Sequence, residues 1–321
     1  MTDFPQLDGF RGGQGVVRLI GHRGARGVMP ENTMEGFAFA LNIGVHAMEF
    51  DVVLTHDQIP VITHNHRLLN AATRGADGNW LTGDELKISD LTLDEIKQLD
   101  VGGLDGRTIY GKRFPDQVFM SGVRMPCLMD LLDFAMQPAG SDLLMLLEIK
   151  SDPNDQPLGN ARSNIAVKVV NEIRSRNLEH RRVLHSFDWK LLETCAEIAP
   201  DIPRSYLSQR PENLDDPGED SQKAVAPDFN SLGVSIPEAV ASAGGKMWCP
   251  YFMDVTPELV AEAHDLSLLV CGWTANEPEE INRMIDAGVD GIITDYPGRA
   301  QRILLSRSIA WSDSTHSEAA E

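Results

Sequence analysis

The sequence is poor in cysteine and has no long hydrophobic run. Its four cysteines lie far apart among 321 residues and form no CxxC pair, so neither a zinc ribbon nor a disulfide framework is predicted. No stretch approaches the roughly 20 consecutive apolar residues of a membrane span, and the N-terminus shows no basic segment followed by an apolar run. We therefore expect a cytoplasmic protein without stable membrane association.

Positive charge is also scarce. The chain carries 28 lysines and arginines against 48 aspartates and glutamates, for a formal net charge of -20 at pH 7. That charge repels nucleic acid and anionic surfaces, although a local cationic pocket can still bind a small anion. With 42% hydrophobic residues, the composition is that of an ordinary globular protein. We expect a small-molecule partner and no nucleic acid, and the oligomeric state stays open.

Short apolar runs alternate with helical periodicity from about residue 17 onward, a pattern typical of repeated βα units around a parallel sheet. The runs that we interpret as strands are residues 17–22, 48–54, 143–150, 183–187, 204–207, 246–249, 268–273 and 291–295, and helical segments include 164–176 and 278–287. This succession predicts a (β/α)8 TIM barrel, a fold of about 250 residues. We expect a single domain over residues 17–305 and a flexible tail over 306–321.

One stretch interrupts the alternation. Residues from about 65 to 126 are too many for an ordinary connection and are rich in Gly, Asp and Arg, so we interpret them as a cap subdomain inserted over the catalytic mouth. An extended segment at 60–64 precedes it, and a helix near 92–99 can begin with Thr92 and Glu95 as a capping box. The acidic segment 211–220 is expected to be a solvated loop.

Three carboxylates are predicted to converge at the end of the barrel. Glu49 and Asp51 alternate in the second strand and therefore point to one face. Glu148 occupies the corresponding place in the third strand. Buried carboxylates need a compensating cation, and a hard divalent metal is one answer. The alternative is a salt-bridge network with Arg23 and Lys150.

Two histidines are candidates for acid–base chemistry. The first strand ends in Gly-His22-Arg23-Gly, at the carboxyl end where barrel enzymes carry their sites. His64 follows the second strand, where His56 and His66 compete for the same role. Imidazoles titrate near neutral pH.

Cations complete this set of candidates. Arg23 offers a fork for phosphate oxygens and Lys150 a point charge, and a metal would polarise a phosphoryl group. The set suits phosphoryl transfer.

Together these motifs resemble the glycerophosphodiester phosphodiesterase family. The resemblance covers about residues 17–300 and rests on Gly-His-Arg-Gly at 21–24, Pro-Glu-Asn-Thr at 30–33, Glu-Phe-Asp at 49–51 with Thr55 and Asp57, the segment 60–64, Leu-Glu-Ile-Lys at 147–150, and Trp-Thr at 273–274. It implies a barrel enzyme that hydrolyses glycerophosphodiesters to an alcohol and sn-glycerol 3-phosphate with Mg²⁺ or Ca²⁺.

The resemblance also assigns roles to residues. It places the metal on Glu49, Asp51 and Glu148, makes His22 and His64 catalytic, and sets Arg23 and Lys150 around the phosphate. Glu31 matches an acid at or behind the metal site. Trp273 resembles an aromatic wall of the substrate pocket, and Phe187 is a similar candidate, although either can be simple core. Asp295 is expected to cap a turn or orient neighbouring groups.

One departure from the family pattern is Asn65, because the second histidine is usually followed by Asp. Two alternatives to glycerophosphodiester hydrolysis stay open: a phosphodiester lyase or lysophospholipase D on the same barrel, and a metal-binding barrel without turnover. The sequence leaves undecided the preferred alcohol, the choice between Mg²⁺ and Ca²⁺, and which histidine is the base.

Overall fold

The computed structural model describes residues 4–12, 14–45, 47–211 and 225–312. The strands are β1 (Arg18–His22), β2 (Ala47–Leu54), β3 (Pro60–Ile62), β4 (Leu144–Ile149), β5 (Arg182–Ser186), β6 (Arg204–Ser208), β7 (Met247–Pro250), β8 (Leu269–Gly272) and β9 (Gly291–Thr294). The α-helices are α1 (Met34–Asn42), α2 (Leu93–Ile96), α3 (Ile109–Lys112), α4 (Leu128–Ala135), α5 (Leu158–Arg174), α6 (Trp189–Ile198), α7 (Ile236–Ser242), α8 (Pro257–Asp265), α9 (Pro278–Ala287) and α10 (Pro297–Ser306). Short 3₁₀ helices are η1 (Pro5–Phe10), η2 (Ile88–Asp90), η3 (Pro138–Gly140), η4 (Glu179–Arg181) and η7 (Phe252–Asp254).

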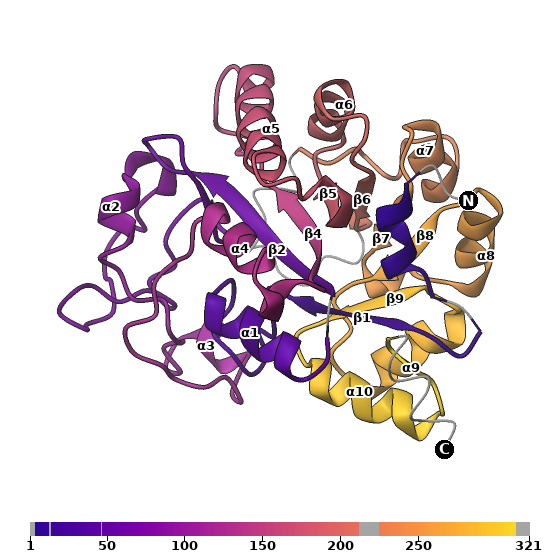
Figure 1. Cartoon of the computed structure of the whole chain (residues 1–321), viewed down its shortest axis with the longest axis horizontal. Coiled ribbons are helices and arrows are strands. Elements are labelled where there is room, and N and C mark those ends of the chain that lie inside the picture. Colours follow the sequence, from indigo (N-terminus) through magenta and orange to yellow (C-terminus); the bar gives the residue numbers. More distant parts are fainter. Residues whose placement is uncertain (1–3, 13, 46, 212–224, 313–321) are drawn as a thin grey trace.

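Eight parallel strands close into a barrel. The sheet order runs β1-β9-β8-β7-β6-β5-β4-β2, and pairing of β1 with β2 closes the ring. Helices surround it on the outside (Figure 1). The predicted (β/α)8 fold is therefore confirmed. Among the residues that the structure describes, no helix is both long enough and apolar enough to cross a membrane.

The inserted segment follows β3, which pairs antiparallel with β2 and corresponds to the extended stretch expected at 60–64. Further along, α2 is shorter than the predicted helix but has the expected capping box of Thr92 and Glu95. A separate small core lies beneath the segment and includes Leu68, Ile88 and Ile96. The insertion therefore has its own packing and lies beside the barrel.

The predicted loop at 211–220 lies, apart from its first residue, outside the described residues, as does the end of the predicted tail. The described part of the tail packs on the barrel: Ala310 bridges to Val16, and the Trp311 indole donates to the Gly44 carbonyl at 3.0 Å. Packing of the barrel thus continues a few residues past the predicted boundary at 305.

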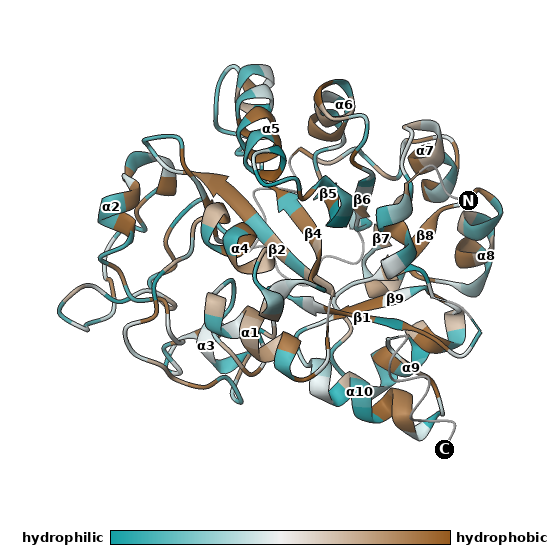
Figure 2. Cartoon of the chain, in the orientation of Figure 1, coloured by the Kyte–Doolittle hydropathy of each residue, from teal (hydrophilic) through white to brown (hydrophobic). Residues whose placement is uncertain are grey.

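Alternation along the strands separates two cores. Ile20, Leu146 and Val183 belong to the cluster inside the barrel, whereas neighbouring strand residues such as Leu19 and Leu147 pack toward the helices. Strands β2 and β4 nevertheless show hydrophilic bands within otherwise hydrophobic arrows (Figure 2). Because strand residues alternate between faces, these bands mark inward positions that turn polar, at Glu49 and Asp51 in β2 and at Glu148 in β4, where a site can form.

Candidate active site

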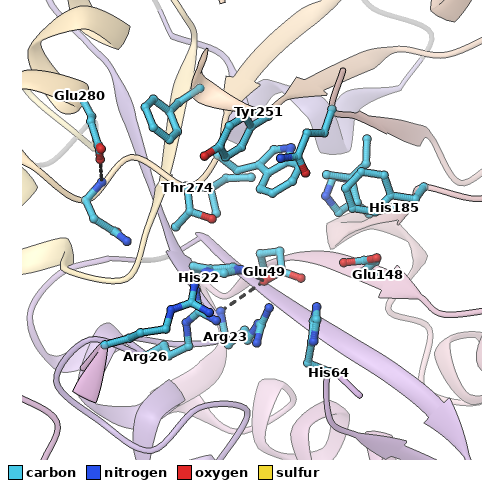
Figure 3. Close-up of a pocket in the computed structure, with 18 of the residues that line it drawn as sticks. His22, Arg23, Arg26, Glu49, His64, Glu148, His185, Tyr251, Thr274 and Glu280 are labelled. Atoms are coloured by element: carbon cyan, nitrogen blue, oxygen red, sulfur yellow. Dashed lines mark hydrogen bonds and ion pairs between the residues drawn. The ribbon is translucent and has the colours of Figure 1, made fainter. Parts of the chain in front are cut away.

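A cavity of about 340 Å³ opens at the carboxyl ends of the barrel strands (Figure 3). Its wall includes several predicted site residues, namely His22, Arg23, Glu49, His64, Glu148, Phe187 and Trp273. One side of the cavity is charged and the other is apolar, where Phe187, Leu207, Tyr251 and Trp273 line it. The structure therefore brings residues from distant parts of the chain into one compartment.

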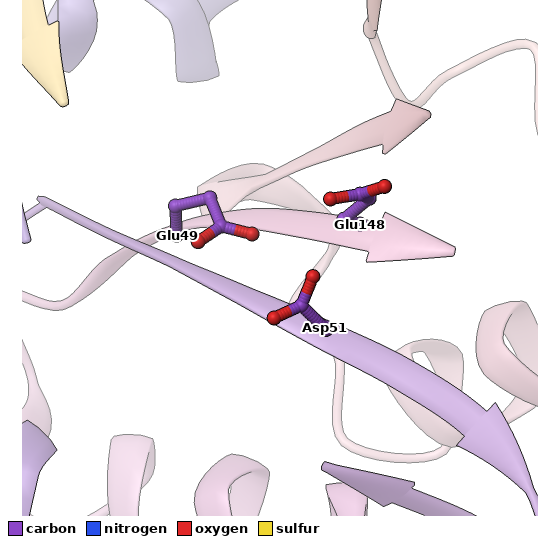
Figure 4. Close-up of side chains that lie close together, drawn as sticks. All are labelled: Glu49, Asp51 and Glu148. Atoms are coloured by element: carbon purple, nitrogen blue, oxygen red, sulfur yellow. The ribbon is translucent and has the colours of Figure 1, made fainter. Parts of the chain in front are cut away.

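The three predicted carboxylates form a single buried cluster. Ligand oxygens of Glu49, Asp51 and Glu148 all lie within 4.8 Å of one another, and the side chains converge from β2 and β4 (Figure 4). Asp51 and Glu148 are register partners across these parallel strands, and Glu49 lies one inward position earlier. This convergence follows from the strand register.

Burial and mutual repulsion perturb these carboxyl groups. Burial, with the neighbouring Asp51 and Glu148, raises the pKa of Glu49 well above its ordinary value. Burial likewise raises the pKa of Glu148 to about 8, despite the nearby Lys150. Burial would raise the pKa of Asp51 too, but Lys150, His64 and Arg23 outweigh it and hold that pKa well below its usual range.

Lys150 lies against the carboxylates. Its ammonium is 2.8 Å from Asp51 Oδ1 and 2.8 Å from Glu148 Oε1, and the residue is not among those lining the main cavity. The ion pairs of the salt-bridge alternative are therefore present, and a phosphate contact for Lys150 stays a prediction.

The donor set fits a divalent metal. Lys150 pairs with Asp51 and Glu148, whereas Glu49 Oε1 has no hydrogen-bond partner among the described residues. Oxygen-only ligands suit a hard ion such as Mg²⁺ or Ca²⁺. The cluster can thus hold a metal, and its chemistry does not decide which of the two.

His22 is held in place by the predicted residue Asp295. Nδ1 of His22 donates to Asp295 Oδ1 at 2.7 Å, because a carboxylate oxygen can only accept. Nε2 then faces the cavity, 3.7 Å from Glu49 Oε2. Burial lowers the pKa of His22, and Asp295 opposes that shift in part. The imidazole is therefore oriented and poised to accept a proton.

Arg23 lies between two carboxylates, those of Glu31 and Asp51. Its guanidinium donates to Glu31 at 2.9 Å and lies 3.4 Å from Asp51. Residue 23 adopts a left-handed conformation with φ 51°, and a Cβ on Gly21 would lie 2.1 Å from the Gly24 carbonyl oxygen. The tight Gly-His-Arg-Gly turn therefore requires glycine at position 21.

His64 enters the same cavity from the chain that follows β3. Its Nδ1 donates to Asn65 Oδ1 at 2.8 Å, so the asparagine orients the ring without adding a charge. Burial, together with Arg23 and Lys150, lowers the pKa of His64 well below its ordinary value. The structure therefore brings His64 into the compartment of His22.

The competing histidines lie elsewhere. His56 is exposed, and His66 lines a separate, smaller cavity with Lys87 and Asp152. Neither lines the main cavity, which agrees with the choice of His64 that the family resemblance implies.

Aromatic side chains form the apolar wall. The rings of Phe187 and Trp273 meet edge to face with their centroids 5.4 Å apart. The ring centroids of Tyr251 and Trp273 are 5.3 Å apart. The Trp273 indole donates to the Cys249 carbonyl at 2.8 Å, which fixes its orientation. Both predicted aromatic residues thus face the cavity, where a substrate could reach them.

The polar residues of the site that the sequence reasoning missed include Arg26, Asn276 and His185. Arg26 donates twice to Asp295, at 2.8 and 3.0 Å, and Asn276 donates to the same carboxylate at 2.7 Å. His185 lines the cavity from β5. A signal for His185 existed, since it lies between Val183 and Phe187 on one strand face. Arg26 and Asn276 are in loops without a comparable pattern.

Comparison with known proteins decides the family. The sequence profile of the glycerophosphoryl diester phosphodiesterase family matches residues 22–299. The chain belongs to this family. The resemblance and the enzyme class predicted from the sequence are therefore confirmed.

Individual relatives agree with this placement. A glycerophosphodiester phosphodiesterase of Caldanaerobacter subterraneus is 29% identical, over 87% of this chain and 94% of the relative. A lysophospholipase D of Homo sapiens is 26% identical, over 90% of this chain and 86% of the relative. A protein of Silicibacter pomeroyi DSS-3, assigned as a glycerophosphoryl diester phosphodiesterase, has a crystal structure that superimposes with a TM-score of 0.90. The two sequences are 56% identical, and the match covers 96% of this chain and 100% of the other. An Oleispira antarctica phosphodiesterase, whose structure holds the product sn-glycerol 3-phosphate, shares the fold with a TM-score of 0.66. It is 21% identical, and the match covers 90% of this chain and 97% of the other.

Proposed function

We propose that this protein hydrolyses glycerophosphodiesters to an alcohol and sn-glycerol 3-phosphate. The observation that carries the proposal is the meeting of the buried His22 and the half-buried His64 with Arg23 at one cavity, beside a buried cluster of three carboxylates. Family membership supports the same reaction. The sn-glycerol 3-phosphate bound to the Oleispira antarctica relative is the product expected from this substrate class.

The proposed division of labour follows from the contacts. Glu49, Asp51 and Glu148 would hold a divalent ion, which supplies Lewis-acid polarisation of the phosphoryl group when bound. Arg23 would bind phosphate oxygens, and Glu31 holds its guanidinium at 2.9 Å. One histidine would accept a proton from the attacking water, or from a substrate hydroxyl whose cyclic phosphate product water then opens, and the other would donate a proton to the leaving alkoxide.

The inserted segment would enclose the substrate. Arg113 of this segment lines the cavity. The backbone N–H of Val118 donates to the Val28 carbonyl at 3.0 Å, which ties the segment to the loop after β1. We propose residues 65–126 as the cap of the single barrel domain predicted at 17–305, onto which Ala310 and Trp311 also pack. We also propose that the enzyme works in the cytoplasm.

The first test is metal-dependent product formation. Wild-type protein should release sn-glycerol 3-phosphate from glycerophosphocholine with Mg²⁺ or Ca²⁺ and lose this activity after chelation. His22→Ala and His64→Ala should each lower kcat on the order of 10²- to 10⁴-fold, the size of a lost acid or base. Product is measured by enzymatic assay and by phosphorus NMR.

The same experiment separates the alternatives. His66→Ala is the matched control, because His66 lines the other cavity, and it should retain near wild-type turnover. A cyclic phosphate in the NMR spectrum would identify a lyase, and turnover of lysophosphatidylcholine alone would identify a lysophospholipase D. No turnover of any diester would leave a metal-binding barrel.

A further inference from the structure

His185 is the cavity histidine that the proposed mechanism leaves without a role. It is 1% exposed and is the register partner of Glu148 across β4 and β5. In the close-up its ring lies beside Glu148, on the side of the cavity that leads from the carboxylates toward the aromatic wall (Figure 3). It therefore occupies the border between the charged and the apolar halves.

The ring of His185 is oriented from behind. Its Nδ1 lies 2.9 Å from the Ser205 hydroxyl, which in turn is 3.2 Å from the Cys249 thiol. These partners are neutral and buried. Because Nδ1 is engaged by Ser205, the other nitrogen, Nε2, is the one left for a ligand in the cavity.

His185 does not belong to the metal cluster. The group of ligand atoms within 4.8 Å of one another comprises Glu49, Asp51 and Glu148, and ligands of one ion at about 2.3 Å must lie within such a range. A ring fixed beside the cluster but outside it is placed to touch whatever substituent the bound phosphate carries on this side.

The chemistry of that substituent follows from its surroundings. Phe187 lies two residues further along the chain, directly after β5, and is packed against Trp273, so the neighbouring wall is apolar. A neutral imidazole next to aromatic rings matches a short carbon chain that bears hydroxyl groups. A glyceryl group has this character, with CH₂ groups for the aromatic wall and hydroxyls for the imidazole.

We propose that His185 is a specificity-determining residue, which hydrogen-bonds a hydroxyl of the substrate's glyceryl group through Nε2. The proposal rests on the proposed function and adds the residue that distinguishes a glyceryl from a plain alkyl phosphodiester. Ser205 acts as its positioning residue.

The test compares two phosphate monoesters that differ only in hydroxyl groups. Binding of sn-glycerol 3-phosphate and of propyl phosphate is measured by calorimetry in the presence of Mg²⁺. Wild-type protein should bind sn-glycerol 3-phosphate about tenfold more tightly, the value of a typical hydrogen bond. His185→Leu should abolish this preference while binding propyl phosphate as before, and His185→Gln, which keeps a hydrogen-bonding group, should restore it.

Other outcomes would overturn the proposal. An absent preference in wild-type protein, or an unchanged preference in His185→Leu, removes His185 from substrate recognition. Equal weakening of both ligands in His185→Leu, with recovery in His185→Gln, would indicate a structural role instead. Hydrolysis of glycerophosphocholine by the wild-type protein is measured separately, so that failure of the proposed function is distinguished from failure of this assignment.

Discussion

At the scale of single residues, the contact that distinguishes this site is the pairing of His22 with Asp295. Asp295 is fully buried, yet it accepts hydrogen bonds from His22, Arg26 and Asn276. Burial would raise the pKa of Asp295, but Arg26 and His22 outweigh it and hold that pKa far below its ordinary value. The carboxylate is therefore charged whenever the enzyme works, and it keeps the proton of His22 on Nδ1.

We expect Asp295→Asn to lower kcat on the order of 10²-fold or more, because a carboxamide can donate to Nδ1 and so stabilise the wrong tautomer of His22. KM should change little, since Asp295 does not line the cavity. Steady-state kinetics on glycerophosphocholine would measure both quantities.

Asp286→Asn is the control for this substitution, because Asp286 pairs with Arg307 at an exposed position on the barrel surface. Its kinetics should match the wild type. A kcat for Asp295→Asn within threefold of wild type would remove the positioning role of Asp295.

At the scale of elements, the inserted segment depends on one buried aspartate. Asp100 accepts hydrogen bonds from the backbone N–H groups of Gly102 and Gly122, at 2.9 and 2.8 Å, and from Arg74 at 3.0 Å. These contacts join three parts of the segment that are remote in sequence. Burial would raise the pKa of Asp100, but the two amides and Arg74 outweigh it and lower that pKa.

This shift predicts a pH-dependent stability of the cap. The folded-state pKa lies below the unfolded value of about 3.9, so the stabilisation is fully present above that value and is lost as pH falls through the folded pKa. At pH 7, Asp100→Asn should lower the free energy of unfolding by about 1–3 kcal/mol. The difference from wild type, measured by urea unfolding, should shrink below about pH 4.

Asp84→Asn, at an exposed position of the same segment, should change the unfolding free energy by less than about 0.5 kcal/mol at either pH. If the Asp100→Asn difference stayed constant from pH 7 to pH 3, the charge of Asp100 would not be the source of its stabilisation.

At the scale of the whole molecule, the barrel is closed at the end opposite the site. Phe10 of η1 is fully buried and Leu7 is 2% exposed, and both belong to the cluster inside the barrel with Ala47 and Met247 at the first residues of their strands. A Cβ on Gly9 would lie 2.3 Å from the Leu144 side chain. The N-terminal 3₁₀ helix thus fills the amino-terminal end of the barrel.

We expect Phe10→Ala to lower the free energy of unfolding by about 3–5 kcal/mol, the usual cost of a large cavity in a core. At a temperature where the variant is folded, kcat should stay close to wild type, because the cavity lies far from the carboxyl ends of the strands. Thermal unfolding and glycerophosphocholine turnover would measure the two effects.

Leu305→Ala is the control, since Leu305 is 55% exposed and its truncation should cost little. Loss of turnover in folded Phe10→Ala protein would show that the two ends of the barrel are coupled.

Much of the fold could be predicted from the sequence because each signal was local. The period of two placed Glu49 and Asp51 on one face, and Thr92 with Glu95 formed the expected capping box. Each of the eight barrel strands begins and ends within one residue of its predicted bounds. The α5 helix begins six residues before its predicted start, because Pro157 rather than a polar cap precedes it.

The sequence by itself determined the barrel, the family and the residue types available for chemistry, because strand period, turn glycines and motif order are properties of short segments. Only the tertiary structure decided which of these residues meet. Strand register placed Glu148 opposite Asp51 and His185 beside Glu148, and barrel closure brought Asp295 from the last strand end to His22 at the first. Such contacts join residues up to 273 positions apart, and no local pattern encodes a distance of that kind.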